Sequence, residues 1–199
     1  MNKKIVFLLL AVLFAALLIG AYVLYDRLSG DLSPEQLATT PNTAPSFAED
    51  TTPDPTAATA APEIVPDFTV YDAEGNPVTL HQFFGKPIVL NFWASWCGPC
   101  QSEMPDFQQM YEQLGDEVQF LMINSTDGSR ETVQTAAAFI AEKGYTFPVF
   151  YDTASSAAIT YSVYSLPTTY FIDANGVGHA YATGAINMET LQQGLDLIR

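Results

Sequence analysis

Two cysteines, Cys97 and Cys100, are the residues whose type and spacing best suit chemistry. They are the only cysteines in a chain of 199 residues, and Gly98-Pro99 separates them. A structural disulfide framework uses more cysteines, spread along the chain. A loop this short also restricts the unfolded chain very little, so it stabilises the fold weakly. The pair therefore indicates either thiol–disulfide redox chemistry or half of a metal site.

The elements around the pair favour redox chemistry. The apolar run Ile88–Trp93 predicts a central strand covered on both faces. A helix is expected over Pro99–Leu114, because proline suits a first helical turn. Free N–H groups and the macrodipole at a helix N-terminus stabilise a thiolate. We expect Cys97 to be the exposed nucleophile and Cys100, one turn further in, to resolve the mixed disulfide.

The metal alternative lacks ligands. A zinc site needs two residues beyond a cysteine pair. The two histidines, His81 and His179, both fall in or beside predicted turns. We assign them no role, and we predict no metal site and no cofactor other than the cysteine pair itself.

The pattern over residues 63–199 predicts one α/β domain. Strands alternate with helices, and an Asn-Gly turn at 175–176 indicates a terminal hairpin. This order predicts a mixed sheet flanked by helices. The expected strands are 68–71, 78–80, 88–93, 118–124, 149–151, 168–173 and 178–183, and the expected helices are 99–114, 130–143, 154–161 and 188–198.

Residues 1–28 predict a membrane anchor that is not cleaved. An uncharged, apolar run of 21 residues, Ile5–Tyr25, follows Lys3 and Lys4. Such a run spans about 30 Å as a helix, the thickness of a bilayer's hydrocarbon core, and the positive-inside rule places the following chain outside the cytoplasm. A cleaved signal peptide is the alternative. Residues 29–62, rich in Thr, Ala and Pro, predict a flexible linker.

Charge excludes one class of function. The chain carries a net charge of −15, and from Glu63 onward it has 4 basic and 16 acidic residues. Such a surface repels phosphate backbones, so nucleic acid is not an expected partner.

The motifs together resemble the thioredoxin superfamily. Residues 91–100, Asn-Phe-Trp-Ala-Ser-Trp-Cys-Gly-Pro-Cys, resemble its active-site strand and turn, and residues 166–170, Leu-Pro-Thr-Thr-Tyr, resemble its cis-proline loop. The pattern Cys-x-x-Cys-x-x-Glu-x-Pro over residues 97–105 is typical of the TlpA/ResA-like branch of membrane-anchored oxidoreductases. An inserted helix and strand between residues 124 and 149, and an N-terminal hairpin, also fit this redoxin-type domain.

The resemblance implies roles for further residues. Leu166 and Pro167 would contact the substrate, with the backbone of Leu166 pairing with the substrate chain. Trp96 should be partly exposed beside the site and should also contact the substrate. Thioredoxins carry a buried Asp where this chain has Asn91. Glu103, on the same helix face as Cys100, would replace it as proton acceptor if burial raises its pKa.

The resemblance also implies partners and alternatives. It implies reduction of protein disulfides outside the cytoplasm of a bacterium, often in cytochrome c maturation, with electrons from a membrane thiol transporter of the CcdA/DsbD type. A thiol peroxidase, with antioxidant activity, is a second possibility, although residues 94–97 lack the Thr of the peroxiredoxin motif. A disulfide-introducing oxidase is a third. A copper-binding module is disfavoured because it uses Cys-x-x-x-Cys.

Overall fold

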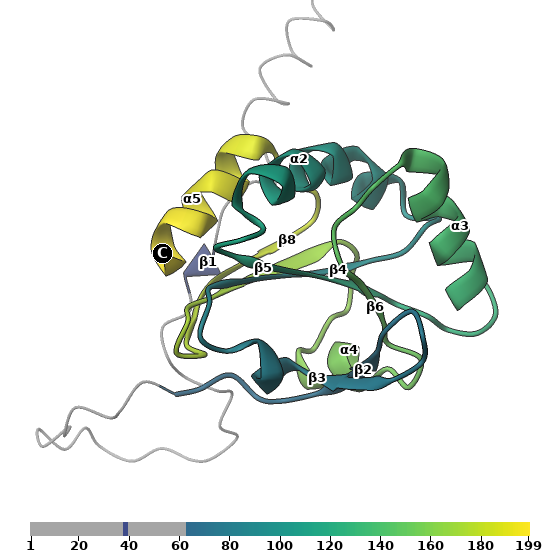
Figure 1. Cartoon of the computed structure of the whole chain (residues 1–199), viewed down its shortest axis with the longest axis horizontal. Helices are drawn as coiled ribbons and strands as arrows, with labels where there is room; N and C mark the ends of the chain where they lie inside the picture. The colour runs from purple at the N-terminus through teal and green to yellow at the C-terminus, as the bar shows by residue number, and fades with distance from the viewer. Residues whose placement is uncertain (1–37, 40–62) are drawn as a thin grey trace, which may run out of the picture. The chain divides into compact units, whose positions relative to one another are not determined.

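A computed structural model describes residues 38–39 and 63–199 (Figure 1). An eight-stranded sheet has the order β1-β8-β7-β4-β5-β6-β2-β3. Its strands are β1 (Ala38–Thr39), β2 (Thr69–Tyr71), β3 (Pro77–Thr79), β4 (Ile88–Trp93), β5 (Gln119–Asn124), β6 (Val149–Tyr151), β7 (Thr168–Ile172) and β8 (Gly178–Thr183). The helices are the 3-10 turn η1 (Leu80–Phe83), α2 (Gly98–Leu114), α3 (Val133–Lys143), α4 (Ser156–Thr160) and α5 (Met188–Ile198).

Strand β4 lies at the centre of this sheet. It pairs in parallel with β5 and antiparallel with β7. All six of its residues are buried, as expected for a strand covered on both faces. The hairpins β2–β3 and β7–β8 are both antiparallel, so the sheet is mixed, as the sequence predicted.

Successive side chains of β4 point into two separate cores. Val89 faces a core formed with α2, α3 and α5, whereas Leu90 faces a core that includes the β2–β3 hairpin and α4. Figure 1 shows the same two layers on opposite sides of the central strands. Burial of each large apolar side chain contributes about 1.5–3 kcal/mol, so this doubly covered strand gives the active-site loop that follows it a rigid base.

Helix α3 begins three residues later than the sequence predicted. Its N-cap is Thr132, whose side chain accepts a hydrogen bond from the Thr135 amide in a capping box. Upstream, the Asp127 carboxylate accepts hydrogen bonds from the amides of Ser129 and Glu131. These bonds fold residues 127–131 into a turn instead of a first helical turn, because an Asp side chain competes with the helix for backbone donors.

Strand β1 lies inside the segment expected to be a linker. Ala38 and Thr39 pair antiparallel with Tyr181 and Ala180 of β8. An edge strand presents unpaired backbone groups, and even a two-residue strand satisfies some of them. The rest of the linker, and the apolar run Ile5–Tyr25, lie outside the described residues. Within the described ranges, no helix combines the length and the apolar character needed to cross a membrane.

Candidate active site

The two cysteines form a disulfide at the start of α2. Their Cα atoms lie 5.3 Å apart. Cys97 is the N-cap residue, and its Sγ accepts a hydrogen bond of 3.2 Å from the Cys100 amide. After reduction, this donor and the helix N-terminus would stabilise a thiolate on Cys97.

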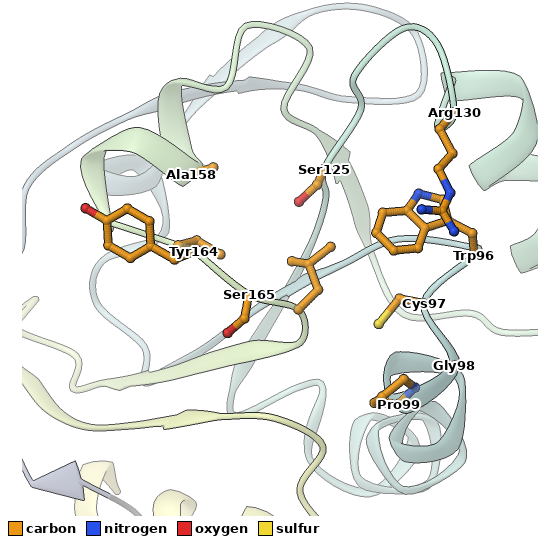
Figure 2. A pocket seen from close by; sticks show the side chains of 11 residues that line it. Trp96, Cys97, Gly98, Pro99, Ser125, Arg130, Ala158, Tyr164 and Ser165 are labelled. Atoms are coloured by element: carbon orange, nitrogen blue, oxygen red, sulfur yellow. The ribbon is translucent and has the colours of Figure 1, made fainter.

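Cys97 lines a groove on the surface of the domain. Figure 2 shows Trp96 and Arg130 on one side of the groove, Ala158 and Tyr164 on the other, and the Cys97 sulfur directed between them. Cys97 is only 4% exposed, so the expectation of a well-exposed nucleophile is wrong for the oxidised form. The disulfide and its neighbours cover most of the sulfur surface. Cys100, at 0% exposed, does not line the groove.

Leu166 brings the cis-proline loop to the same groove. It lines the opening together with Cys97, and the Leu166–Pro167 peptide bond is cis. Pro167 itself is buried, and its carbonyl accepts a hydrogen bond from the Gly184 amide. Among the described residues, the backbone of Leu166 forms no hydrogen bond. A free backbone beside the reactive sulfur is available to an extended peptide.

Glu103 lies buried on α2, one turn beyond Cys100, with 2% of its surface exposed. Its Oε1 accepts a hydrogen bond of 2.8 Å from Asn91 Nδ2, and its Oε2 accepts one of 2.9 Å from the Ile186 amide. Burial raises the pKa of Glu103 to about 8, against the opposing effect of these two bonds. The burial and the pKa rise expected from the sequence are therefore present.

Asn91 connects Glu103 to the sheet. Its Nδ2 also donates to Thr169 Oγ1, at 2.9 Å, on the neighbouring strand β7. Its Oδ1 is buried and has no hydrogen-bond partner among the described residues. An amide assigned in the opposite orientation would present that oxygen to a protonated Glu103. The pair can thus satisfy either protonation state of the carboxyl group.

Glu131 is a site residue that the sequence analysis missed. It is fully buried, and its carboxylate accepts hydrogen bonds from the Ser95 amide (2.9 Å), the Ser95 hydroxyl (2.6 Å) and Asn124 Nδ2 (2.7 Å). Ser95 lies two residues before Cys97, so Glu131 fixes the loop that carries the nucleophile. No local motif signals this role, because the bonds to Ser95 join residues 36 positions apart.

Trp96 lies beside the site, partly exposed, as predicted. Its indole ring is covered by Arg130, whose Cζ lies 3.7 Å from the ring centroid. This distance is typical of a cation–π contact. Trp93, the last residue of the strand predicted to be covered on both faces, is fully buried. His81 and His179 contact Val65 and Asp173 away from the groove.

This geometry defines a class of protein. A cysteine pair that opens a helix after a central strand, facing a cis-proline loop, is the arrangement of a thioredoxin-like thiol–disulfide oxidoreductase. Such proteins use the cysteine pair itself and no cofactor. Among the described residues, no group of three or more His, Cys, Asp or Glu side chains is placed to hold a metal.

Comparison with known proteins agrees with this class. Residues 62–177 match the model of the AhpC/TSA family. Thiol-disulfide oxidoreductase ResA of Geobacillus thermodenitrificans is 34% identical over 143 residues, covering 71% of this chain and 80% of the relative. The chain therefore belongs to the AhpC/TSA family, and its relatives include thiol–disulfide oxidoreductases of the ResA type.

Solved structures show the same fold. StoA from Bacillus subtilis is 27% identical with a TM-score of 0.57, covering 67% of this chain and 99% of StoA. The exposed lipoprotein thioredoxin of Streptococcus pneumoniae strain TIGR4 is 30% identical with a TM-score of 0.56, covering 66% of this chain and 98% of that structure.

Proposed function

We propose that this chain is an extracytoplasmic, membrane-anchored reductase of protein disulfides. The observation that carries the proposal is the Cys97–Cys100 disulfide at the α2 N-terminus, beside the free backbone of Leu166. The exposed lipoprotein among its structural relatives supports the location. The apolar run Ile5–Tyr25 would provide the anchor.

The reaction is a two-electron exchange. The Cys97 thiolate attacks one sulfur of the substrate disulfide, so a mixed disulfide forms and the other substrate sulfur leaves as a thiolate. Cys100 then attacks Cys97 Sγ, which releases the second substrate thiolate and forms the Cys97–Cys100 disulfide. The substrate gains two electrons, and its thiolates take up protons.

Glu103 would move the proton of Cys100. The pKa of Glu103, about 8, lies close to that of an ordinary thiol, about 8.5, so transfer in either direction is nearly balanced. The ionised form would accept the Cys100 proton during substrate reduction. The protonated form would return it when the domain is reduced again.

An electron donor must regenerate the dithiol. Outside the cytoplasm the surroundings are oxidising, so the electrons must come from the cytoplasm. A membrane thiol transporter of the CcdA/DsbD type would supply them. Cytochrome c maturation is the process that we propose the chain serves, because residues 97–105 carry the motif of the TlpA/ResA-like branch.

The reduction potential of the cysteine pair tests the direction. The full-length chain, kept in a mild detergent, is equilibrated in dithiothreitol or glutathione buffers, and the reduced fraction is measured. We expect about −270 mV or lower, the range of thioredoxin. A potential near about −120 mV would instead make the chain an oxidant that introduces disulfides.

Trapping tests the assignment of the two cysteines. The Cys100→Ser variant should accumulate a mixed disulfide with a substrate peptide, because Cys97 attacks but nothing resolves the product. The matched Cys97→Ser variant should not accumulate it. Equal trapping by both variants would contradict the assignment of Cys97 as the nucleophile.

A further inference from the structure

The charge of the groove beside Cys97 differs from that of the domain. The groove has a volume of about 530 Å³, and among its lining residues one, Arg130, is charged. From Glu63 onward, acidic residues outnumber basic ones by 16 to 4. A positive groove on so acidic a domain is the opposite of what composition alone predicts.

Arg130 differs from the other cations of the described domain. Lys143 and Arg199 form salt bridges with Glu142 and Glu117, and Lys86 donates to the Asp116 carbonyl. Arg130 forms no salt bridge with any described residue, although its charge acts on Asp127 of the same loop. Its guanidinium therefore remains available to a ligand.

Hydrogen bonds hold the loop that carries Arg130 in place beside the site. Asp127 accepts two backbone hydrogen bonds within the loop, and the buried Glu131 anchors the loop to Ser95. Contact with the Trp96 ring uses one face of the guanidinium. Its N–H groups lie at the edges, where they are free for a bidentate contact with a carboxylate. Figure 2 shows this stacked pair beside the Cys97 sulfur.

We propose that Arg130 is a specificity-determining residue that binds a carboxylate of the substrate polypeptide, close in sequence to the cysteine that Cys97 attacks. The inference rests on the proposed exchange reaction with protein substrates. It predicts a preference for disulfides flanked by Asp or Glu. Because the domain as a whole repels strongly acidic partners, the preference concerns one local carboxylate and not an acidic protein surface.

The opposite wall of the groove fits a polypeptide better than a small disulfide. Tyr164 is 95% exposed there, and Ser165 and Leu166 continue the wall. An extended chain that pairs with the Leu166 backbone would pass Cys97 with alternate side chains directed towards the Trp96–Arg130 pair. A carboxylate on such a side chain would meet the guanidinium edge.

The test uses three disulfide-linked peptides that differ only at positions within three residues of one cysteine. These positions carry Glu, Gln or Lys. The pre-reduced full-length chain is mixed with each peptide, and single-turnover reduction is followed at about 20 mM salt. We expect the Glu peptide to react about threefold faster than the Gln peptide, in the range of a partly exposed ion pair, and the Lys peptide to react more slowly.

Variants of Arg130 test whether this residue causes the preference for the Glu peptide. The ratio of Glu to Gln rates should fall to about 1 in Arg130→Gln and at about 0.5 M salt, and should fall below 1 in Arg130→Glu. Lys143→Gln removes a cation that also lies over an aromatic ring, Phe139, but on α3 outside the groove. This matched control should keep the wild-type ratio. A ratio unchanged in both Arg130 variants would overturn the proposal, as would an equal loss in Lys143→Gln.

The same peptides separate this inference from the proposed direction of reaction. If the chain is an oxidant, the pre-reduced form will not reduce the peptides, but the oxidised form will oxidise their dithiols. The Arg130-dependent ratio is then expected in that direction. If replacing Arg130 slows the reaction with glutathione disulfide but changes the rate with none of the peptides, a polypeptide ligand is refuted.

Discussion

Replacing Glu103 with Gln should change how the stability of the protein depends on pH. The pKa of Glu103 is about 8 in the folded protein, against 4.5 for an exposed Glu. A raised carboxyl pKa gives stability that is complete below pH 4.5 and is lost as the pH rises to 8. At about 1.4 kcal/mol per pKa unit, the wild type should lose about 3 kcal/mol by pH 7 and about 5 kcal/mol above pH 9.

The assay is urea denaturation of the oxidised full-length chain from pH 4.5 to 9.5, followed by far-UV circular dichroism. The free energy of unfolding of Glu103→Gln minus that of the wild type should increase with pH over this window. The neutral Gln amide can still accept from the Ile186 amide and donate to Asn91 Oδ1 after an amide flip. Glu112→Gln, exposed on the same helix, is the matched control and should leave the curve nearly parallel to the wild type. A difference that is constant across the window would refute the raised pKa.

Three further substitutions test a buried hydrogen-bond network, core packing and helix capping. The free energy of unfolding is measured by urea or thermal denaturation. Glu131→Ala leaves the amide and hydroxyl of Ser95 without their acceptor and should cost about 3 kcal/mol. Gly194→Ala places a Cβ against the Phe171 ring in the core under α5, and should cost about 1–3 kcal/mol. Thr132→Ala removes the capping box of α3 and should cost about 1 kcal/mol.

Two of these predictions have a matched comparison variant. Glu131→Gln keeps one acceptor oxygen and should be milder than Glu131→Ala. Gln193→Ala, exposed beside Gly194 on α5, should leave the melting temperature within about 1 °C. A Gly194→Ala protein as stable as Gln193→Ala would show that the Phe171 ring moves aside without penalty.

Local patterns predicted the frame of the molecule well. Strand β4 has the same bounds as the predicted strand 88–93. A strand buried on both faces is a run of consecutive apolar residues, which can be recognised without knowing what packs against it. The start of α5 at Met188 follows from Asn187, whose side chain accepts from the Thr190 amide. The resemblance to the TlpA/ResA-like branch implied the role of Glu103, and helix spacing added only that it shares a face with Cys100.

Long-range polar contacts were not predictable from these patterns. The expected helix over residues 130–143 placed Arg130 and Glu131 in its first turn. In the structure the same residues form a turn that directs one side chain to Trp96 and the other to Ser95. Single-sequence patterns carry information on periodicity and capping, but none on which distant loop a side chain will meet.

The pairing of β1 with β8 has a consequence for the reach of the domain. If residues 1–28 hold the chain in a membrane, a linker of 34 residues, 29–62, would extend at most about 120 Å at full stretch. If Ala38 stays paired with β8, only residues 29–37 connect the anchor to the domain, and this segment can span at most about 30 Å. Pairing of β1 with β8 would then limit the tether to this shorter length, and separation of the two strands would lengthen it several-fold.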